Sequence, residues 1–267
     1  MENPTPPPAD PPQPPFGQTV WTEPWPRRVR AFVGDVAVAD STRVLILFER
    51  DHRPIFYFPP DDVRAELLEP SDKHTTCPRK GEASYWSIRV GERVVPDAVW
   101  SYAQPLPGRE DITGYRALYW HKVDAWFEED DEIYVHAKDP YSRVDVLNSS
   151  RHVVVSLDGE VLADTVRPRL LFETGLPTRY YVPQADVRMD LLTPTETSTQ
   201  CPYKGVARYW SATVGGAVHD DIAWSYPFPI PECPKIEGLV CFFNERTDIT
   251  VDGEPQARPQ TAWSRPR

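Results

Sequence analysis

The sequence predicts a mainly β protein with two similar small antiparallel domains, each sandwich-like or barrel-like and each carrying one short helix. Three observations predict this class. The chain repeats itself at an offset of about 124 residues, β-branched and aromatic residues alternate with polar ones over short runs, and no strand–helix–strand pattern is present. A length of 267 residues accommodates two domains of ordinary size.

The repeat is ungapped from near Val38 to near Asp124. Its strongest block is TTCPRKGEASYWSIRVG at 75–91, which matches TQCPYKGVARYWSATVG at 199–215, and DAVWSY at 97–102 matches DIAWSY at 221–226. We therefore divide the chain into a disordered proline-rich tail (1–28), a first β-rich repeat (29–135), a linker (136–150), a second repeat (151–256) and a disordered C-terminal tail (257–267).

Each repeat opens with a predicted hairpin, which turns at Gly34-Asp35 and at Asp158-Gly159. Further strands of the first repeat are predicted at VLILFE (44–49), IFYF (55–58), YWSIRV (85–90), AVWSY (98–102), YRALYW (115–120) and VDAWFE (123–128). The helical signal is DVRAELL at 62–68 and DVRMDLL at 186–192. Asp62 or Asp186 is the expected N-cap there, and Pro70 or Pro194 the expected end.

Composition limits the classes of partner. The net charge is −11, with acidic residues in both repeats, so a phosphate backbone is repelled on average and we expect no nucleic-acid partner. No apolar run reaches the ~20 residues that span a membrane, and the N-terminus lacks the pattern of a secretory signal. With four cysteines in a chain of this length, we expect a soluble protein in the reducing cytoplasm, whose proline-rich tail is a possible contact for a protein partner.

The candidate catalytic residues are a lysine and a glutamate in each repeat. Lys80 and Lys204 lie in Pro-x-Lys-Gly turns before an aromatic strand, whereas Glu49 and Glu173 end an apolar strand, where a charge needs a partner. Such a lysine can bind a carboxylate or phosphate, act as acid, base or Schiff-base nucleophile, or simply be a solvated turn residue. We predict that it points into a cleft closed by the glutamate, and that replacing it costs little stability.

Alternation along the aromatic strand sends Trp86, Ile88 and Val90 to one face and Tyr85, Ser87 and Arg89 to the other. One face is core, and the other face is suited to line a pocket, although aromatic residues also simply fill β cores. The candidate ligand-binding residues are Cys77, Cys201, Tyr85, Tyr209, Trp86, Trp210, Trp100, Trp224, Tyr102, Tyr226, Arg64 and Arg188. For the two arginines, pairing with Glu49 and Glu173 or contact with an anion both remain open.

Metal sites are weakly supported. Cys77 and Cys201 each stand alone before proline, without the paired ligands of a zinc site. Asp62 and Glu66 are spaced to share a helical face and hold magnesium, as are Asp186 and Asp190, but an N-cap explains the first aspartate of each pair and no phosphate-binding loop is present. We expect no metal and no cofactor.

The block Cys-Pro-x-Lys-Gly-x-Ala-x-Tyr-Trp, at 77–86 and 201–210, and the Trp-Ser-Tyr triplet after it resemble a bacterial family known as domain of unknown function 427, which often occurs as tandem copies. The resemblance covers about 29–255. It implies a compact β-rich fold and no agreed reaction, although a nucleotidyltransferase label is sometimes attached. The second copy departs near its end, where FFNERTDITVDG replaces YWHKVDAWFEED and two tryptophans, Trp120 and Trp126, have no counterpart.

Three functions follow from these observations. The first is small-molecule binding in an aromatic, lysine-lined pocket in each repeat, with catalysis left open. The second is a protein-interaction module, and the third is nucleotidyl transfer, which rests on the family label alone.

Overall fold

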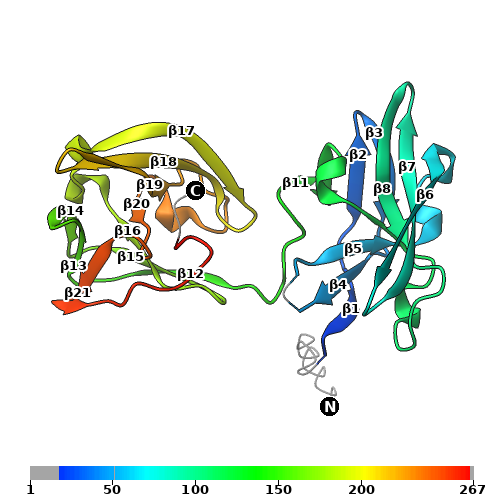
Figure 1. Ribbon diagram of the computed structural model, residues 1–267, viewed down its shortest axis with the longest axis horizontal. Helices are drawn as coiled ribbons and strands as arrows, with labels where there is room; N and C mark the ends of the chain where they lie inside the picture. The colour runs from blue at the N-terminus through cyan, green and yellow to red at the C-terminus, as the bar shows by residue number, and fades with distance from the viewer. Residues whose placement is uncertain (1–17, 51, 265–267) are drawn as a thin grey trace, which may run out of the picture. The chain divides into compact units, whose positions relative to one another are not determined.

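The computed structural model describes residues 18–50 and 52–264, in two compact units with their boundary between Tyr141 and Ser142. Each unit pairs a seven-stranded antiparallel sheet with a four-stranded one (Figure 1). The strands described here do not close into a barrel in either unit, so the sandwich alternative of the predicted mainly β class is the one observed.

In the first unit the large sheet has the spatial order β1 (Val20–Pro24), β4 (Leu45–Glu49), β5 (Ile55–Phe58), β9 (Arg116–Leu118), β8 (Arg93–Ser101), β7 (Gly81–Val90) and β6 (Leu68–Cys77). The small sheet is β11 (Asp131–Ile133), β10 (Ala125–Glu128), β2 (Val29–Val33) and β3 (Val36–Ser41). Short 3₁₀ turns are η1 (Pro60–Asp62), η2 (Ala65–Leu67), η3 (Glu110–Ile112) and η4 (Trp120–Lys122).

The second unit repeats this order. Its large sheet is β12 (Val144–Asn148), β15 (Arg169–Glu173), β16 (Arg179–Val182), β20 (Val240–Phe242), β19 (Ala217–Ser225), β18 (Gly205–Val214) and β17 (Leu192–Cys201). Its small sheet is β14 (Glu160–Thr165), β13 (Val153–Leu157), β21 (Asp248–Val251) and β22 (Glu254–Pro255), and its 3₁₀ turns are η5 (Gln184–Asp186), η6 (Met189–Leu191) and η7 (Pro234–Ile236). Both predicted hairpin turns are confirmed, between β2 and β3 and between β13 and β14.

The large sheet of the first unit is apolar on both faces. One face packs with the small sheet around a core that includes Val29, Ala31, Ile46, Phe56, Ile88 and Val99. The opposite face carries a separate cluster that includes Leu47, Tyr57, Ala83, Tyr85, Trp100 and Ala117. Neighbours such as Phe56 and Tyr57 thus point to opposite faces, as the period of a strand requires. The predicted alternation is confirmed, with Trp86, Ile88 and Val90 in the core and Tyr85 on the other face.

The predicted short helix is wrong in both repeats. Residues 60–67 form two separate 3₁₀ turns, η1 and η2, because Val63 between them is extended, with φ −115° and ψ 124°. Val63 is buried and bridges to Ala39, and the Arg64 amide donates to the Val38 carbonyl at 3.0 Å. Asp62 caps no helix. Its carboxylate accepts hydrogen bonds from Ser41 at 2.6 Å and Arg43 at 2.7 Å, and Val187 and Asp186 repeat this arrangement.

Several stretches that we assigned to tails and linker form regular contacts. Within the expected tail 1–28, residues 20–24 form β1, which pairs with β4, and Trp25 is buried; residues 1–17 lie outside the described part. The expected linker 136–150 contains β12, an edge strand of the second unit. In the expected C-terminal tail, Thr261 and Trp263 pack on the second unit. These segments are ordered because their tryptophans are buried and their backbone groups are paired, and neither contact can be inferred from proline content.

Candidate functional site

The Pro-x-Lys-Gly turn joins β6 to β7 and is held in one place by the loop at 104–106. Gly81 has a φ of +106°, which residues with a side chain rarely adopt. The Leu106 amide donates to the Lys80 carbonyl at 3.0 Å, and a Cβ added at Gly81 would lie 3.3 Å from the Leu106 nitrogen. Glycine therefore permits both the turn and its close approach to this loop.

This turn buries the Lys80 ammonium against Glu49. Their side chains are 8% and 9% exposed, and the lysine Nζ donates directly to a glutamate oxygen, while Arg79 Nη1 donates to the other oxygen at 3.1 Å. Burial on its own raises the pKa of the Glu49 carboxyl, but the hydrogen bond and charge of Lys80 outweigh burial. That pKa therefore lies below its ordinary value of 4.5.

The second repeat builds the same pair. Lys204 Nζ donates to Glu173 Oε2 at 2.5 Å, and both side chains are about as buried, at 10% exposed. The arginine beside the lysine is replaced by Tyr203. The structure thus brings together each lysine and glutamate that the sequence singled out.

We expect the buried Lys80–Glu49 pair to make the unfolding free energy of the first unit fall at acidic pH. Because the folded pKa of Glu49 is lowered, its contribution is fully present above about pH 4.5 and is lost as pH falls through the lower, folded value. Urea unfolding of the wild type between pH 6 and pH 3 should therefore show a steeper loss of unfolding free energy than the Glu49→Leu/Lys80→Met variant shows. Equal slopes for the two proteins would contradict this expectation.

An aromatic wall stands beside the pair on the outer face of the large sheet. Trp100 Nε1 donates to the Tyr57 hydroxyl at 3.3 Å, and the Tyr85 and Thr75 hydroxyls share a hydrogen bond of 2.7 Å. Tyr119 lies 4.6 Å from the Trp100 ring centre and stacks on Tyr85 at an interplanar angle of 11°. Burial, with the hydrogen bond and charge of Tyr85, raises the pKa of Tyr119 to about 12, so this phenol stays neutral at ordinary pH.

A pocket of about 850 Å³ lies over this wall in the first repeat. Six of the predicted residues line it: Glu49, Cys77, Lys80, Tyr85, Trp100 and Tyr102. Lining residues that sequence reasoning missed include His52, Arg53, Tyr57, Arg79, Tyr119, His121 and His136. Of these, Tyr57 had a signal in the sequence, since Tyr181 stands at its position in the second repeat and both alternate with core residues.

Four predicted ligand-binding residues lie elsewhere. Trp86 and Trp210 pack against the main cores between the sheets. Arg64 pairs with Glu66 at 2.7 Å and Arg188 with Asp190 at 2.7 Å, so neither arginine reaches the glutamate that ends the apolar strand. Because the predicted helix is two short turns, each arginine points along the surface and pairs with the carboxylate two residues later.

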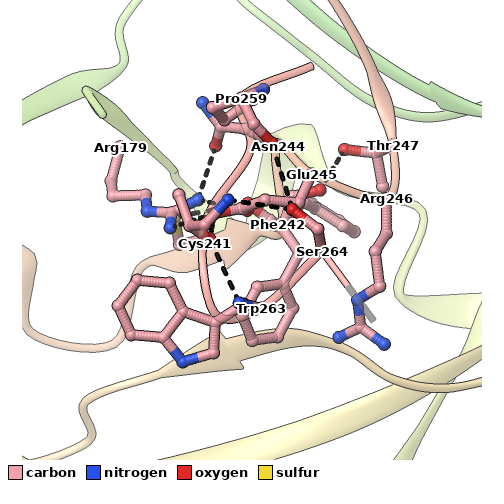
Figure 2. Close-up of polar contacts among 12 residues, drawn as sticks. Arg179, Cys241, Phe242, Asn244, Glu245, Arg246, Thr247, Pro259, Trp263 and Ser264 are labelled. Carbon is pink, nitrogen blue, oxygen red and sulfur yellow. Dashed lines mark hydrogen bonds and ion pairs between the residues drawn. The ribbon is translucent and has the colours of Figure 1, made fainter. Parts of the chain in front are cut away.

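The corresponding place in the second repeat is filled by a polar cluster, which Figure 2 shows in close-up. Arg179 forms two 2.7 Å hydrogen bonds to Glu245, and their side chains are 7% and 0% exposed. The guanidinium carbon lies 5.5 Å from the ring centres of both Trp224 and Trp263. The Thr261 hydroxyl donates to the same glutamate at 2.6 Å, so the C-terminal segment takes part in this cluster.

No group of three or more histidine, cysteine, aspartate or glutamate residues within 18–50 and 52–264 is arranged to hold a metal ion. No helix among these residues is long and apolar enough to cross a membrane. A family model described as a domain of unknown function, DUF427, matches residues 21–129 and again residues 145–253. A search of curated proteins found no match.

Proposed function

We propose that the first repeat of this chain, which belongs to the DUF427 family of domains of unknown function, binds a small organic molecule with a planar ring and an acidic group. The family match covers both repeats. The observation that carries this proposal is the pocket of about 850 Å³ that is bounded by the Lys80–Glu49 pair and by the rings of Tyr57, Tyr85 and Trp100. Its size lies in the range of small-molecule sites, which bury most of a ligand among apolar groups and a few fixed polar ones.

The wall favours a planar ring. Trp100 lies in edge contact with Tyr57, with ring planes at 87°, and the Tyr57 hydroxyl is fixed by the indole N–H. Tyr57 is fully buried and Trp100 is 8% exposed, so a ligand reaches this pair at Trp100, whose fixed ring loses little further freedom on binding. Aromatic pairs contribute roughly 0.5–1.5 kcal/mol beyond the area that they bury.

The charge of the lining favours an acidic group. The described lining residues include three cationic side chains, Arg53, Arg79 and Lys80, and one carboxylate, Glu49. Lys80 and Arg79 both bond to that carboxylate, whereas Arg53 is exposed and forms no ion pair with a carboxylate in the described part of the chain. The pocket thus has surplus positive charge in a chain whose net charge is −11, and an arginine is well suited to bind a carboxylate.

Lys80 has a positioning role in this proposal. Its ammonium is held by Glu49, which fixes the turn and one wall of the pocket, and two of its three N–H donors remain for a ligand oxygen. We propose binding and assign no reaction.

The experiment compares two probes that share the naphthalene ring and carry opposite charges, 2-naphthoate and 2-naphthylmethylammonium, by isothermal titration calorimetry. We expect saturable binding of the naphthoate and much weaker binding of the ammonium compound. Arg53→Gln should weaken naphthoate binding roughly tenfold, because one charge-assisted hydrogen bond contributes about 1.5–3 kcal/mol.

Arg64→Gln is the matched control, since Arg64 is another exposed arginine of the first unit but lies outside the pocket lining. It should leave naphthoate binding unchanged. The proposal fails if the wild type saturates with neither probe, or if the two glutamine variants lose affinity equally.

We also propose a reducing, cytoplasmic setting, supported by the cysteines. All four are free thiols, and Cys233 and Cys241 are buried. Burial raises the pKa of Cys233 to about 11 and that of Cys241 to about 12, so both remain as protonated, unreactive thiols at ordinary pH.

A further inference from the structure

We infer that two positions in each repeat determine whether that repeat holds a ligand, so that the chain has one ligand site and not two. In the first repeat these positions are Ile55 and His121, and in the second they are Arg179 and Glu245. The inference rests on the proposed function of the first repeat. It goes further in assigning different roles to two repeats of one fold.

The two places correspond closely in structure. Phe56 pairs with Ile46 across β4 and β5, and Tyr180 pairs with Leu170 in the same way across β15 and β16. Ile55 and Arg179 therefore occupy equivalent positions in the two repeats. The indole N–H of Trp100 bonds to Tyr57 at 3.3 Å, and that of Trp224 bonds to Tyr181 at 3.2 Å. The neighbouring ring centres lie 4.6 Å apart for Trp100 and Tyr119, and 4.5 Å apart for Trp224 and Phe243. The wall is therefore the same in both repeats.

What lies against the wall differs. In the second repeat the planar guanidinium of Arg179 occupies the place over Trp224. The Trp263 ring lies against the same guanidinium (Figure 2). The carboxylate of Glu245 neutralises it with a two-point contact. The proposed ligand would stack a flat group on the wall and form an ion pair beside it. In the second repeat the chain itself supplies both contacts.

In the first repeat these contacts are missing at the same positions. Ile55 has no charged end to lay over Trp100, and His121 is exposed and lines the pocket. The rings of the wall are as buried as in the second repeat, with Trp100 and Trp224 each 8% exposed. In the first repeat, however, they border an open pocket, whose lining keeps the positive charge of Arg53 and Arg79.

Displacing the native groups from the second repeat is costly. The Glu245 side chain is 0% exposed, and a ligand that pushed Arg179 aside would leave a buried carboxylate without its partner. Loss of one partner from a buried pair costs far more than a weak ligand can supply. A small acidic ligand should therefore leave the second repeat empty.

The test exchanges the two pairs and counts the 2-naphthoate bound per full-length chain by isothermal titration calorimetry. The wild type should bind one equivalent. Ile55→Arg/His121→Glu gives the first repeat the filling pair of the second, and naphthoate affinity should fall at least tenfold. Arg179→Ile/Glu245→His/Trp263→Ala empties the second repeat and removes both charges together, so no buried charge is left alone. A second binding event should then appear beside the first, and it should be weaker because Pro177 and Tyr203 stand where the first repeat has Arg53 and Arg79.

Near-ultraviolet circular dichroism of each variant establishes that it is folded, and the two exchanges test the inference from opposite directions if one of them fails to fold. Two equivalents bound by the wild type, retained affinity in the folded Ile55→Arg/His121→Glu variant, or a single equivalent in the folded triple variant would each overturn the inference. A wild type that binds no naphthoate overturns the proposed function instead.

Discussion

Replacing Lys80 by methionine is expected to lower the unfolding free energy of the first unit by about 3 kcal/mol, at the lower end of the range for breaking a buried ion pair. Methionine fills similar space but leaves the Glu49 carboxylate, 9% exposed, with Arg79 as its one ion-pair partner among the described residues. From the sequence we expected little loss, because a turn lysine is usually solvated. The buried pair reverses that expectation. Urea unfolding followed by tryptophan fluorescence measures the loss.

Two controls separate the pair from other effects. Glu49→Leu/Lys80→Met removes both charges and should recover most of the lost stability, because no charge is then left buried. Lys73→Met removes a half-buried lysine whose Nζ lies 3.7 Å from Asp97 and 4.5 Å from the Tyr85 ring centre, and should cost about 1 kcal/mol. A Lys80→Met protein within about 0.5 kcal/mol of the wild type would show that the lysine is not structural.

Gly205→Ala is the second change with a large expected effect, about 3 kcal/mol on the second unit. The φ of +106° is strained for alanine, which alone costs of the order of 1–3 kcal/mol. In addition, the new Cβ would lie 3.1 Å from the Phe228 carbonyl oxygen and 3.3 Å from the Ile230 nitrogen, both of them backbone atoms that cannot swing away. Thermal and urea unfolding of the full chain measure the loss.

Gly216→Ala is the matched control in the same unit. Its φ is +83°, but nothing lies within 4 Å of the added Cβ, so only the conformational cost applies. Gly81→Ala should fall between the two, because its nearest atoms lie at 3.3 and 3.4 Å. Equal losses at Gly205 and Gly216 would mean that the close approach of the 228–230 loop contributes nothing.

The sequence predicts the strands well because their signal is local. Alternation over five or six residues and a Gly-Asp or Asp-Gly turn suffice to define the hairpins at Gly34 and Gly159. The short helix fails because the deciding contacts are distant. Val63 and Val187 each bridge to a strand more than twenty residues earlier, and this pairing outweighs the helical tendency of the residues that follow.

Half of the site follows from duplication and half does not. Lys80, Glu49 and the Trp100 ring recur at the same offset in the second repeat, so comparing the repeats singles them out. Arg53 and His121 line the pocket but are replaced by other residues in the second repeat, so comparing the two repeats does not identify them. Trp263 lies in a polar C-terminal stretch with no periodicity, where only the fold shows that it packs on Arg179.

The edge strands β1 and β12 have a consequence for where each repeat begins. β1 pairs with β4 over Val20–Pro24, and β12 pairs with β15 over Val144–Asn148, at the same offset as the motifs. A fragment that starts at residue 29 or 151 would bare the backbone N–H and C=O groups of an apolar strand, which invites sheet edges of different molecules to join. Fragments intended to behave as monomers should therefore begin ahead of Val20 or Val144.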